Sequence, residues 1–510
     1  MKSLYDLLDN AASKHAERIA LGFKDQLLSY GVLKDAVDRL ASGLKELGFQ
    51  PGDRIAVMLP NSPHFPIVYF AILRIGCVVI PVTVHCTPED IRHQLEEAEI
   101  KGIVYWEGNR NDVLRWISGL EQRQKRIVLG GKAMADETRL NYLMEIHPPL
   151  QEKVDVSPDD TAVVAYTDRM KGRSKGVELT HRNLLANIDA CVEFLKLTPE
   201  DGTVCAIPLY HMLGQTLAMN LFLSVGGRVD LIPAFQPDAV CRVMREWKLT
   251  HFIGVPAMYK AILETPEIEA DDFATVKLCL SSGGAMEQEI LDAFETKFKV
   301  MILEGYSLTE ASPMVTFHVP KGERKAGFIG PPLPGIDIRI VDDDGSEILP
   351  GKIGEIVVQG PNVMKGYLNR PEATKESLRG GWLHTGDLAT LQENGQMTVV
   401  SRRRDLIIKS GFTIYPNELE SVLQSHPKVT ESVVVGMPDP VQGQEIHACV
   451  SLKADETATP DEIIAFTKEK LPLYKCPKSV MVVQALPKGP TGRVIRDQIK
   501  QMLSDRGIPN

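Results

Sequence analysis

The chain has little that would place it in a membrane, on a nucleic acid or around a structural metal. No stretch approaches the roughly 18 consecutive apolar residues of a membrane-spanning helix. The eight cysteines are scattered, with no CxxC pair and no histidine spacing that suits zinc. The net charge of −10 argues against a nucleic-acid partner, because phosphate backbones bind clustered cations. The N-terminal segment carries acids early and lacks the apolar region of a signal peptide, so we expect a cytoplasmic protein.

What is present is the composition of a folded globular protein of more than one domain. Hydrophobic residues make up 44% and charged residues 24% of the 510 residues. A single core rarely grows beyond about 250–300 residues, so a chain of this length predicts a division. Residues 53–106 alternate short apolar strands with helical patterns, which is typical of a parallel sheet covered by helices. The fold class is therefore predicted to be α/β and multidomain, with parallel-rich subdomains.

Towards the C-terminus the pattern changes twice. From about residue 326 to 403, strands punctuated by Gly and Pro predict a small antiparallel β-barrel. From residue 404 to 510, three apolar strands and two amphipathic helices predict a compact α+β domain. We therefore expect an N-terminal body over 1–403 and a C-terminal domain over 404–510.

Three polar or glycine-rich segments follow predicted strands in the N-terminal body. They are Tyr166–Val177, Ser281–Met286 and Glu304–Glu310. The first is expected at a strand-to-helix junction, where backbone N–H groups could bind phosphate. The second could let a flat ring approach the backbone, and the third combines an aromatic ring, two hydroxyls and a carboxylate. Each alone has an ordinary alternative as a surface loop or tight turn, but ligands of open α/β sheets bind beyond the carboxyl ends of the strands. Together they favour a nucleotide site.

Two further segments carry charge. His384–Asp387 offers a carboxylate in a predicted turn, where it could accept hydrogen bonds from ribose hydroxyls. Arg402–Arg404 is a short basic run whose ordinary alternative is a solvated turn.

Taken in order, these segments resemble the adenylate-forming superfamily of acyl-CoA synthetases, luciferases and peptide-synthetase adenylation domains. The resemblance extends to Pro208–Gly214, Arg402–Gly411 and Tyr415–Glu420, so it spans nearly the whole chain. Among the branches, fatty-acid and other acyl-CoA synthetases are the most similar, since no fused carrier domain is present.

The resemblance implies a role for each matched residue. Tyr306 would stack on adenine, Asp387 with Arg402 would hold the ribose, and Arg404 would be the hinge of a mobile C-terminal domain. Glu310 would bind Mg²⁺. The implied catalytic residues are His211, which gates the acyl pocket, Thr309, Glu310 and Arg493. The other implied nucleotide contacts are Thr167, Lys171, Gly172, Lys175, Gly283, Gly284, Ala285, Ser307 and Thr309.

The implied activity is that of an ATP-dependent acid–CoA ligase. A carboxylic acid would react with ATP to give an acyl-adenylate and pyrophosphate, and coenzyme A would then displace AMP. ATP, Mg²⁺, coenzyme A and the acid are the implied ligands, and a homodimer is left open. The acyl pocket is expected near residues 214–221 and 251–258, whose apolar character favours a fatty or aromatic acid. The alternative, that both stretches are simply core, stays open.

Two departures from the family pattern affect adenylation. Asp168, Arg169, Met170 and Lys171 stand where the phosphate loop of the family has Ser-Gly-Thr-Thr, and Ser174 replaces its proline. Hydroxyl donors and a flexible glycine are lost there, and a negative charge is added. Arg493 stands where the family has its catalytic lysine, and a planar guanidinium does not replace an ammonium at a tight site. Two alternatives therefore stand beside the ligase: an ATP-independent enzyme acting on acyl-CoA or acyl-adenylate, and a non-catalytic binding protein.

Overall fold

The computed structural model describes residues 1–510 apart from 84–87, 121–123, 168–173, 323, 490–493 and 509–510. The chain divides into two compact units. The first comprises Met1–Ile338 and Val358–Leu383, and the second comprises Arg339–Val357 and His384–Asn510.

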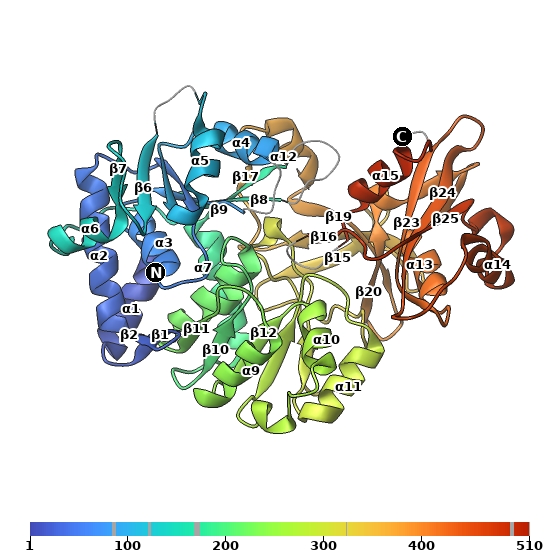
Figure 1. Ribbon diagram of the computed structural model, residues 1–510, viewed down its shortest axis with the longest axis horizontal. Helices are drawn as coiled ribbons and strands as arrows, with labels where there is room; N and C mark the ends of the chain where they lie inside the picture. The colour runs from blue at the N-terminus through green and yellow to red at the C-terminus, as the bar shows by residue number, and fades with distance from the viewer. Residues whose placement is uncertain (84–87, 121–123, 168–173, 323, 490–493, 509–510) are drawn as a thin grey trace. The chain divides into compact units, whose positions relative to one another are not determined.

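The first unit contains an eight-stranded sheet in the order β17-β9-β8-β4-β3-β5-β6-β7 (Figure 1). Its strands are β3 (Arg54–Met58), β4 (Val78–Pro81), β5 (Gly102–Trp106), β6 (Lys125–Leu129), β7 (Glu137–Arg139), β8 (Thr161–Tyr166), β9 (Gly176–Thr180) and β17 (Gly366–Tyr367). The strands from β8 to β7 pair in parallel, whereas β9 is antiparallel to both β8 and β17. The central strands are almost continuously apolar because both faces are covered.

Helices accompany this sheet in the alternation that the sequence predicts. They are α1 (Leu4–His15), α2 (Tyr30–Glu46), α3 (His64–Arg74), α4 (Pro88–Glu97), α5 (Arg110–Ile117), α6 (Leu140–Ile146) and α12 (Pro371–Ser377), with the short η1 (Glu107–Asn109). Ser3 and Ser29 cap α1 and α2 by accepting backbone N–H groups of the first turn. The core on one side of the sheet gathers Ile80, Ile91, Ile103, Tyr105 and Leu368.

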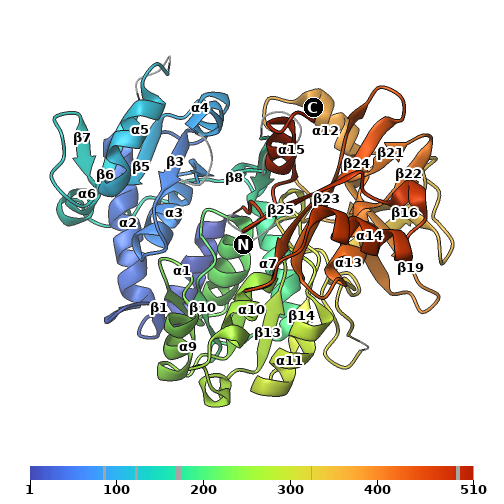
Figure 2. The ribbon, with the colours of Figure 1, turned by 45° about the vertical axis from the view of Figure 1, so that its right-hand side comes forward.

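A seven-stranded sheet follows in the same unit, in the order β14-β13-β12-β10-β11-β1-β2. Its strands are β1 (Ile19–Phe23), β2 (Gln26–Ser29), β10 (Gly202–Cys205), β11 (Arg228–Leu231), β12 (His251–Gly254), β13 (Leu278–Ser281) and β14 (Ile302–Glu304). Its helical segments are α7 (His181–Leu195), η2 (Gly214–Asn220), α8 (Leu221–Ser224), α9 (Pro237–Glu246), α10 (Pro256–Glu264), η3 (Ala270–Phe273), α11 (Gln288–Phe298) and η4 (Thr309–Ala311). Figure 2 shows α9, α10 and α11 beside the strands β10 to β14. Edge-to-face aromatic contacts among Phe252, Tyr259 and Phe294 fill the space beneath these helices.

The second unit carries the C-terminal α+β domain and part of the region predicted as a barrel, whose residues 326–338 and 358–383 belong to the first unit. The barrel region forms a five-stranded sheet of β15 (Asp337–Val341), β16 (Ile353–Gln359), β19 (Trp382–Leu391) and β18 (Leu378–Arg379), with β20 (Met397–Arg402) beside β19. The C-terminal sheet has the order β22-β21-β24-β23, with β25 beside β24. Its elements are η5 (Arg403–Asp405), β21 (Ile407–Lys409), β22 (Phe412–Ile414), α13 (Pro416–Gln424), β23 (Val429–Asp439), β24 (Gly443–Leu452), α14 (Pro460–Lys470), η6 (Leu473–Lys475), β25 (Ser479–Val483) and α15 (Arg496–Ser504).

The predicted fold class is confirmed: a large α/β unit rich in parallel strands is followed by a smaller unit. The boundary at residues 403 and 404 stays a prediction. The seven cysteines that the structure describes are buried free thiols, as expected, and Cys86 lies outside the described residues. Among the described residues, no helix is long and apolar enough to cross a membrane.

Two local predictions are wrong. The loop after β8 does not lead into a helix, because β9 stands between that loop and α7 and pairs with β8 as a hairpin. Asp387 does not lie in a turn, because residues 382–391 form the continuous strand β19. Gly386 has φ +72° within that strand, a conformation that glycine adopts without steric cost.

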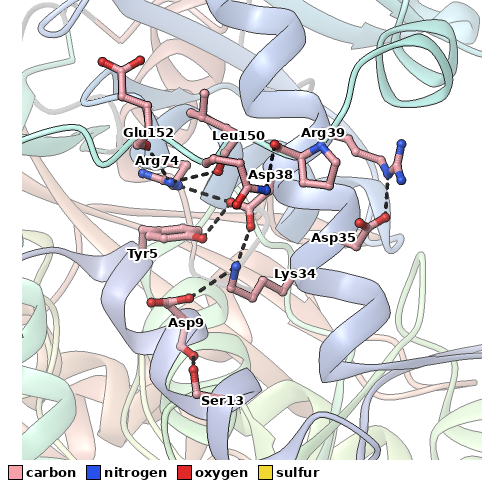
Figure 3. A network of polar contacts seen from close by, with 12 residues as sticks. Tyr5, Asp9, Ser13, Lys34, Asp35, Asp38, Arg39, Arg74, Leu150 and Glu152 are labelled. Carbon is pink, nitrogen blue, oxygen red and sulfur yellow. Dashed lines mark hydrogen bonds and ion pairs between the residues drawn. The ribbon is translucent and has the colours of Figure 1, made fainter.

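Buried polar groups also hold the first unit together. Asp38 of α2 is 3% exposed and accepts hydrogen bonds from Tyr5 of α1, Lys34 of α2 and Arg74 of α3 at 2.7, 2.6 and 3.2 Å (Figure 3). Arg74 also donates to the carbonyl oxygens of Leu150 and Glu152. Because the carboxylate is surrounded by donors, it joins three helices without an unpaired charge.

Candidate active site

Two of the predicted site segments emerge side by side from the seven-stranded sheet. The parallel register sets Gly254 opposite Ser281 and Ser281 opposite Glu304, so β12, β13 and β14 end at the same edge. Ser282, directly after β13, donates to the carbonyl oxygen of Gly305 at 2.8 Å. Its hydroxyl also lies 2.8 Å from the hydroxyl of Ser307. The glycine segment and the Glu304–Glu310 segment are therefore joined by side-chain hydrogen bonds.

The glycine segment presents bare backbone to solvent. Gly283, Gly284 and Ala285 are exposed, and Gly283 has φ +87°, which excludes most other residues. A Cβ atom on Gly283 would meet only Val255, at 3.5 Å, and one on Gly284 would meet only Pro256, at 3.8 Å. The space above these glycines accommodates a flat ring lying close to the backbone.

Tyr306 lies in the neighbouring Glu304–Glu310 segment, two residues after β14, and is 8% exposed. Its N–H donates to the Thr316 hydroxyl at 3.2 Å, which fixes the backbone where the chain leaves β14. Glu304, two residues earlier, is 3% exposed, and burial raises the pKa of its carboxyl to about 8. Backbone N–H groups of Met286 and Gly327 oppose that rise in pKa. Glu304 is therefore mostly protonated at neutral pH and adds no negative charge beside the site.

Glu310 is held by a tyrosine that the sequence did not single out. The hydroxyl of Tyr367, in β17, donates to Oε1 of Glu310 at 2.9 Å. The ammonium of Lys175 lies 4.5 Å from the centroid of the Tyr367 ring, within cation–π range. Burial, and then the charge of Glu310, raise the pKa of Tyr367 well above its ordinary value, so the phenol keeps its proton. Tyr367 thereby links Lys175 and Glu310, two residues assigned to the nucleotide site from separate segments of the first unit.

No local signal marks Tyr367 as a site residue. It is a single tyrosine after a glycine, and its position depends on β17 pairing with β9, where Tyr367 is opposite Val177. That pairing joins residues almost 200 positions apart, which periodicity cannot reveal.

The base of the predicted phosphate loop is an ordered hairpin end. Thr167 N–H donates to the Lys175 carbonyl oxygen at 3.0 Å, and Lys175 N–H donates to the Thr167 hydroxyl at 3.3 Å. Ser174, which replaces the proline of the family, is 3% exposed, and its hydroxyl accepts from Gln94 of α4 at 3.4 Å. The carbonyl oxygen of Ser174 accepts from Arg370, also at 3.4 Å. The loop therefore starts and ends in fixed positions.

Two other predicted residues of this loop, Lys171 and Gly172, lie outside the described residues, as do the divergent positions 168–170. Arg493 lies outside them as well.

His211 follows β10 and precedes η2. Its N–H donates to the carbonyl oxygen of Pro208 at 3.0 Å, and its side chain is half-buried. The two stretches proposed for the acyl pocket differ: 214–221 is completely buried, whereas 251–258 is buried except around Pro256 and Ala257. Their burial fits both the pocket and the core interpretation.

In the second unit the structure brings Asp387 and Arg402 together. They are register partners on β19 and β20, and Nε of Arg402 lies 2.9 Å from Oδ1 of Asp387. Arg403 pairs with Asp343 at 2.7 Å, and Arg404 lies 3.7 Å from Asp405. Partial burial, and then the charge of Arg402, lower the pKa of Arg404. The basic run is thus a set of ion pairs, and the hinge role of Arg404 stays a prediction.

Comparison with known proteins assigns the family. A model described as AMP-binding enzyme matches residues 8–368, and one described as AMP-binding enzyme C-terminal domain matches residues 418–493. A long-chain-fatty-acid–CoA ligase of Yersinia pestis is 34% identical, over 98% of this chain and 94% of the relative. A feruloyl-CoA synthase of Amycolatopsis is also 34% identical, over 96% of both chains. The crystal structure of ATP-bound MatB from Rhodopseudomonas palustris matches with a TM-score of 0.90 and 30% identity over 99% of both chains. The chain therefore belongs to the AMP-binding enzyme family.

Proposed function

We propose that this protein is an ATP-dependent acid–CoA ligase that converts an apolar carboxylic acid to its CoA thioester. The observation that carries the proposal is the joined pair of loops at the ends of β13 and β14. Ser282 and Ser307 connect an open glycine surface to the segment that holds Tyr306, Thr309 and Glu310. The long-chain-fatty-acid–CoA ligase relatives and the ATP-bound structural neighbour support the same reading.

In the first unit, adenine would lie on the backbone of Gly283 and Gly284 beside Tyr306. Ala285 and Ser307 would border it. In the second unit, Asp387 would offer carboxylate oxygens to the ribose hydroxyls, and its ion pair with Arg402 would orient that carboxylate.

Glu310 fits a magnesium ligand. Tyr367 occupies Oε1 of Glu310, and Mg²⁺ is commonly bound by one or two carboxylates together with substrate phosphates. The described residues contain no cluster of three or more metal-ligating His, Cys, Asp or Glu side chains, which agrees with a site completed by the substrate. When bound, the ion would neutralise phosphate charge. Thr309 would add a hydroxyl next to Glu310.

The proposed reaction has two steps. In the first, a carboxylate oxygen of the acid bonds to the α-phosphorus of ATP, and the bond to the bridging oxygen of pyrophosphate breaks. In the second, the thiol of coenzyme A loses its proton and bonds to the acyl carbon, and AMP leaves. Lys175, held over Tyr367, supplies positive charge where charge develops on the phosphates. Arg493 is assigned the same task at the carboxylate and α-phosphate.

The altered phosphate loop supports a second candidate, an enzyme or binding protein that takes a ready-made acyl-CoA or acyl-adenylate. The ordered hairpin end favours the ligase instead, because Thr167 and Lys175 keep their mutual hydrogen bonds. The cytoplasmic location remains part of this proposal.

Pyrophosphate release and AMP formation test the proposal, measured with ATP, Mg²⁺, coenzyme A and a panel of fatty and aromatic acids. Turnover of at least one acid is expected. A quadruple exchange of residues 168–171 to Ser-Gly-Thr-Thr and the single exchange Arg493→Lys should each raise the adenylation rate if the departures slow it. Absence of turnover with every acid, together with tight binding of acyl-CoA, would establish the second candidate.

A further inference from the structure

The segment after His211 is a π-helix, η2 (Gly214–Asn220), and every one of its residues is buried. Gln215 N–H donates to the carbonyl oxygen of His211 at 3.0 Å, and Leu221 N–H donates to that of Thr216, five residues back. Widened helical turns of this kind are rare and occur frequently at functional sites.

Two amides on η2 have hydrogen-bonding atoms without a partner. Gln215 is 0% exposed, and neither Oε1 nor Nε2 has a partner among the residues that the structure describes. Asn220, also 0% exposed, donates through Nδ2 to the Tyr69 hydroxyl at 3.2 Å, but its Oδ1 has no partner in the same part of the chain. Unpaired amide atoms in a protein interior are costly and uncommon.

The pairing of Asn187 shows that such atoms are not general in this unit. Asn187 on α7 is likewise 0% exposed, yet its Nδ2 donates to the Met314 carbonyl oxygen at 2.7 Å and its Oδ1 accepts from Met314 N–H at 3.2 Å. Among the described residues, unpaired amide atoms occur on three asparagine or glutamine side chains, and η2 carries two of them, the third being Asn362.

The η2 segment contacts the loop that carries Thr309 and Glu310, the residues proposed to face the phosphates and Mg²⁺. Thr216 Oγ1 donates to the Ser312 carbonyl oxygen at 3.2 Å, and Ser312 directly follows η4, which contains Thr309 and Glu310. An acid whose carboxylate reaches the α-phosphate must start near that loop. His211, Gln215 and Asn220 follow one another at intervals of four and five residues, about one helical turn each, and His211 is half-buried whereas Gln215 and Asn220 are fully buried.

We infer that Gln215 and Asn220 bind a neutral hydroxyl group at the far end of the acid, so that the preferred substrate is a hydroxylated rather than a plain hydrocarbon acid. This inference rests on the proposed function. Asn220 Oδ1 can only accept, so the ligand must donate a proton to satisfy it, and Gln215 can both accept and donate. A hydroxyl does both, whereas an ether or ketone donates nothing. A second carboxylate would need a cation, and residues 212–223 contain no Lys or Arg.

The competing explanation is a buried water molecule that bonds the same atoms and plays only a structural part. The two explanations differ in acid selectivity, and in the stability of a variant that removes the amide. An acid-binding amide discriminates between acids, whereas a water-filled site does not.

The experiment compares matched acids on the full-length protein and on Gln215→Met, which preserves side-chain length. The first pair is an ω-hydroxylated fatty acid and the corresponding plain fatty acid. The second pair is para-hydroxycinnamic acid and cinnamic acid. The methyl ethers of the two hydroxylated acids form a third set. AMP formation gives kcat/KM, and calorimetry without ATP gives the affinity for each acid. We expect the wild-type protein to favour the hydroxylated member about tenfold or more, and the ether to behave like the plain acid. Gln215→Met should bring that ratio to about one or reverse it.

The stability of the unliganded variants separates a binding role from a structural one. Gln215→Met should leave Tm unchanged or raise it, because no partner among the described residues is lost. Asn187→Leu, in which two paired atoms are removed, should lower Tm. Equal affinity for both members of each pair, or a Tm loss in Gln215→Met as large as in Asn187→Leu, would overturn the inference. If no acid is turned over but calorimetry still shows the preference, the inference stands and the ligase proposal fails.

Discussion

The buried polar groups around Asp38 and those on η2, both in the first unit, differ in whether their polar atoms are paired. Around Asp38, side chains from α1, α2 and α3 all donate to the carboxylate, and the network joins the three helices (Figure 3). On η2 the amides of Gln215 and the Oδ1 of Asn220 are equally buried but unpaired. A polar group retained for stability has partners within the chain, because burial without them is unfavourable. The unpaired amides of Gln215 and Asn220, on a segment next to the proposed site, are therefore positions where we expect a ligand.

Removing the paired carboxylate should give the largest effect. Asp38→Ala removes the acceptor shared by the buried Tyr5 and the half-buried Lys34 and Arg74, and we expect a loss of about 3–5 kcal/mol in the free energy of unfolding. Urea denaturation measures this loss, with the unfolding transition of the first unit as the signal. Asp35→Ala on the same helix is the matched control, since the exposed Asp35–Arg39 pair should contribute less than about 1 kcal/mol. Equal losses in the two variants would contradict the role assigned to Asp38.

The buried carboxyl of Glu304 extends the comparison between paired and unpaired buried groups to the pH dependence of stability. Its pKa is raised from 4.5 in the unfolded chain to about 8 in the folded protein, so the folded state retains a proton that the unfolded state releases. Its contribution to stability is full below pH 4.5 and is lost as pH rises to about 8. Glu304→Gln should therefore gain stability relative to wild type across this window, by about 1–3 kcal/mol at its upper end. Parallel stability profiles for the two proteins would contradict the raised pKa.

A contact within the proposed site should have a smaller effect on stability and a clear effect on activity. Tyr367→Phe removes the hydrogen bond to Glu310 while keeping the ring under Lys175. We expect kcat/KM for adenylation to fall about tenfold, with a higher Mg²⁺ concentration needed for half-maximal rate. Titration of the pyrophosphate release rate with Mg²⁺ measures both. Tyr142→Phe, at an exposed tyrosine, should leave both values unchanged.

Neighbouring serines provide the smallest and most direct test. Ser282→Ala removes the hydroxyl that bonds Gly305 and Ser307, and should cost about 0.5–1.5 kcal/mol in ATP binding or stability. Ser281→Ala removes a hydroxyl that is 0% exposed and has no partner among the described residues, so the change should be close to neutral. Calorimetric titration with ATP and thermal unfolding compare the pair. A greater loss in Ser281→Ala would contradict the distinction between paired and unpaired groups.

Much of the architecture follows from local patterns. Short apolar runs such as 54–58 and 278–281 are strands, and helices such as α4 and α9 begin at prolines that the first helical turn accepts. Local patterns do not reveal the strand β9, because a short segment between a glycine-rich loop and a capping threonine carries little periodicity. Asp387 was expected in a turn because a glycine precedes it, yet its pairing with Arg402 keeps it in a strand.

The amino-acid sequence by itself determined the α/β class and which segments carry glycine, hydroxyl and carboxylate groups, because these depend on composition and near-neighbour spacing. Only the tertiary structure decided that Tyr367 holds Glu310, that Ser282 bonds Ser307, and that Gln215 is buried without a partner. Each of those facts depends on which distant segments pack together. Whether a side chain is buried and whether its polar atoms are paired depend on the residues that the fold places around it. A functional group can therefore be assigned to a site only when those surrounding residues are known.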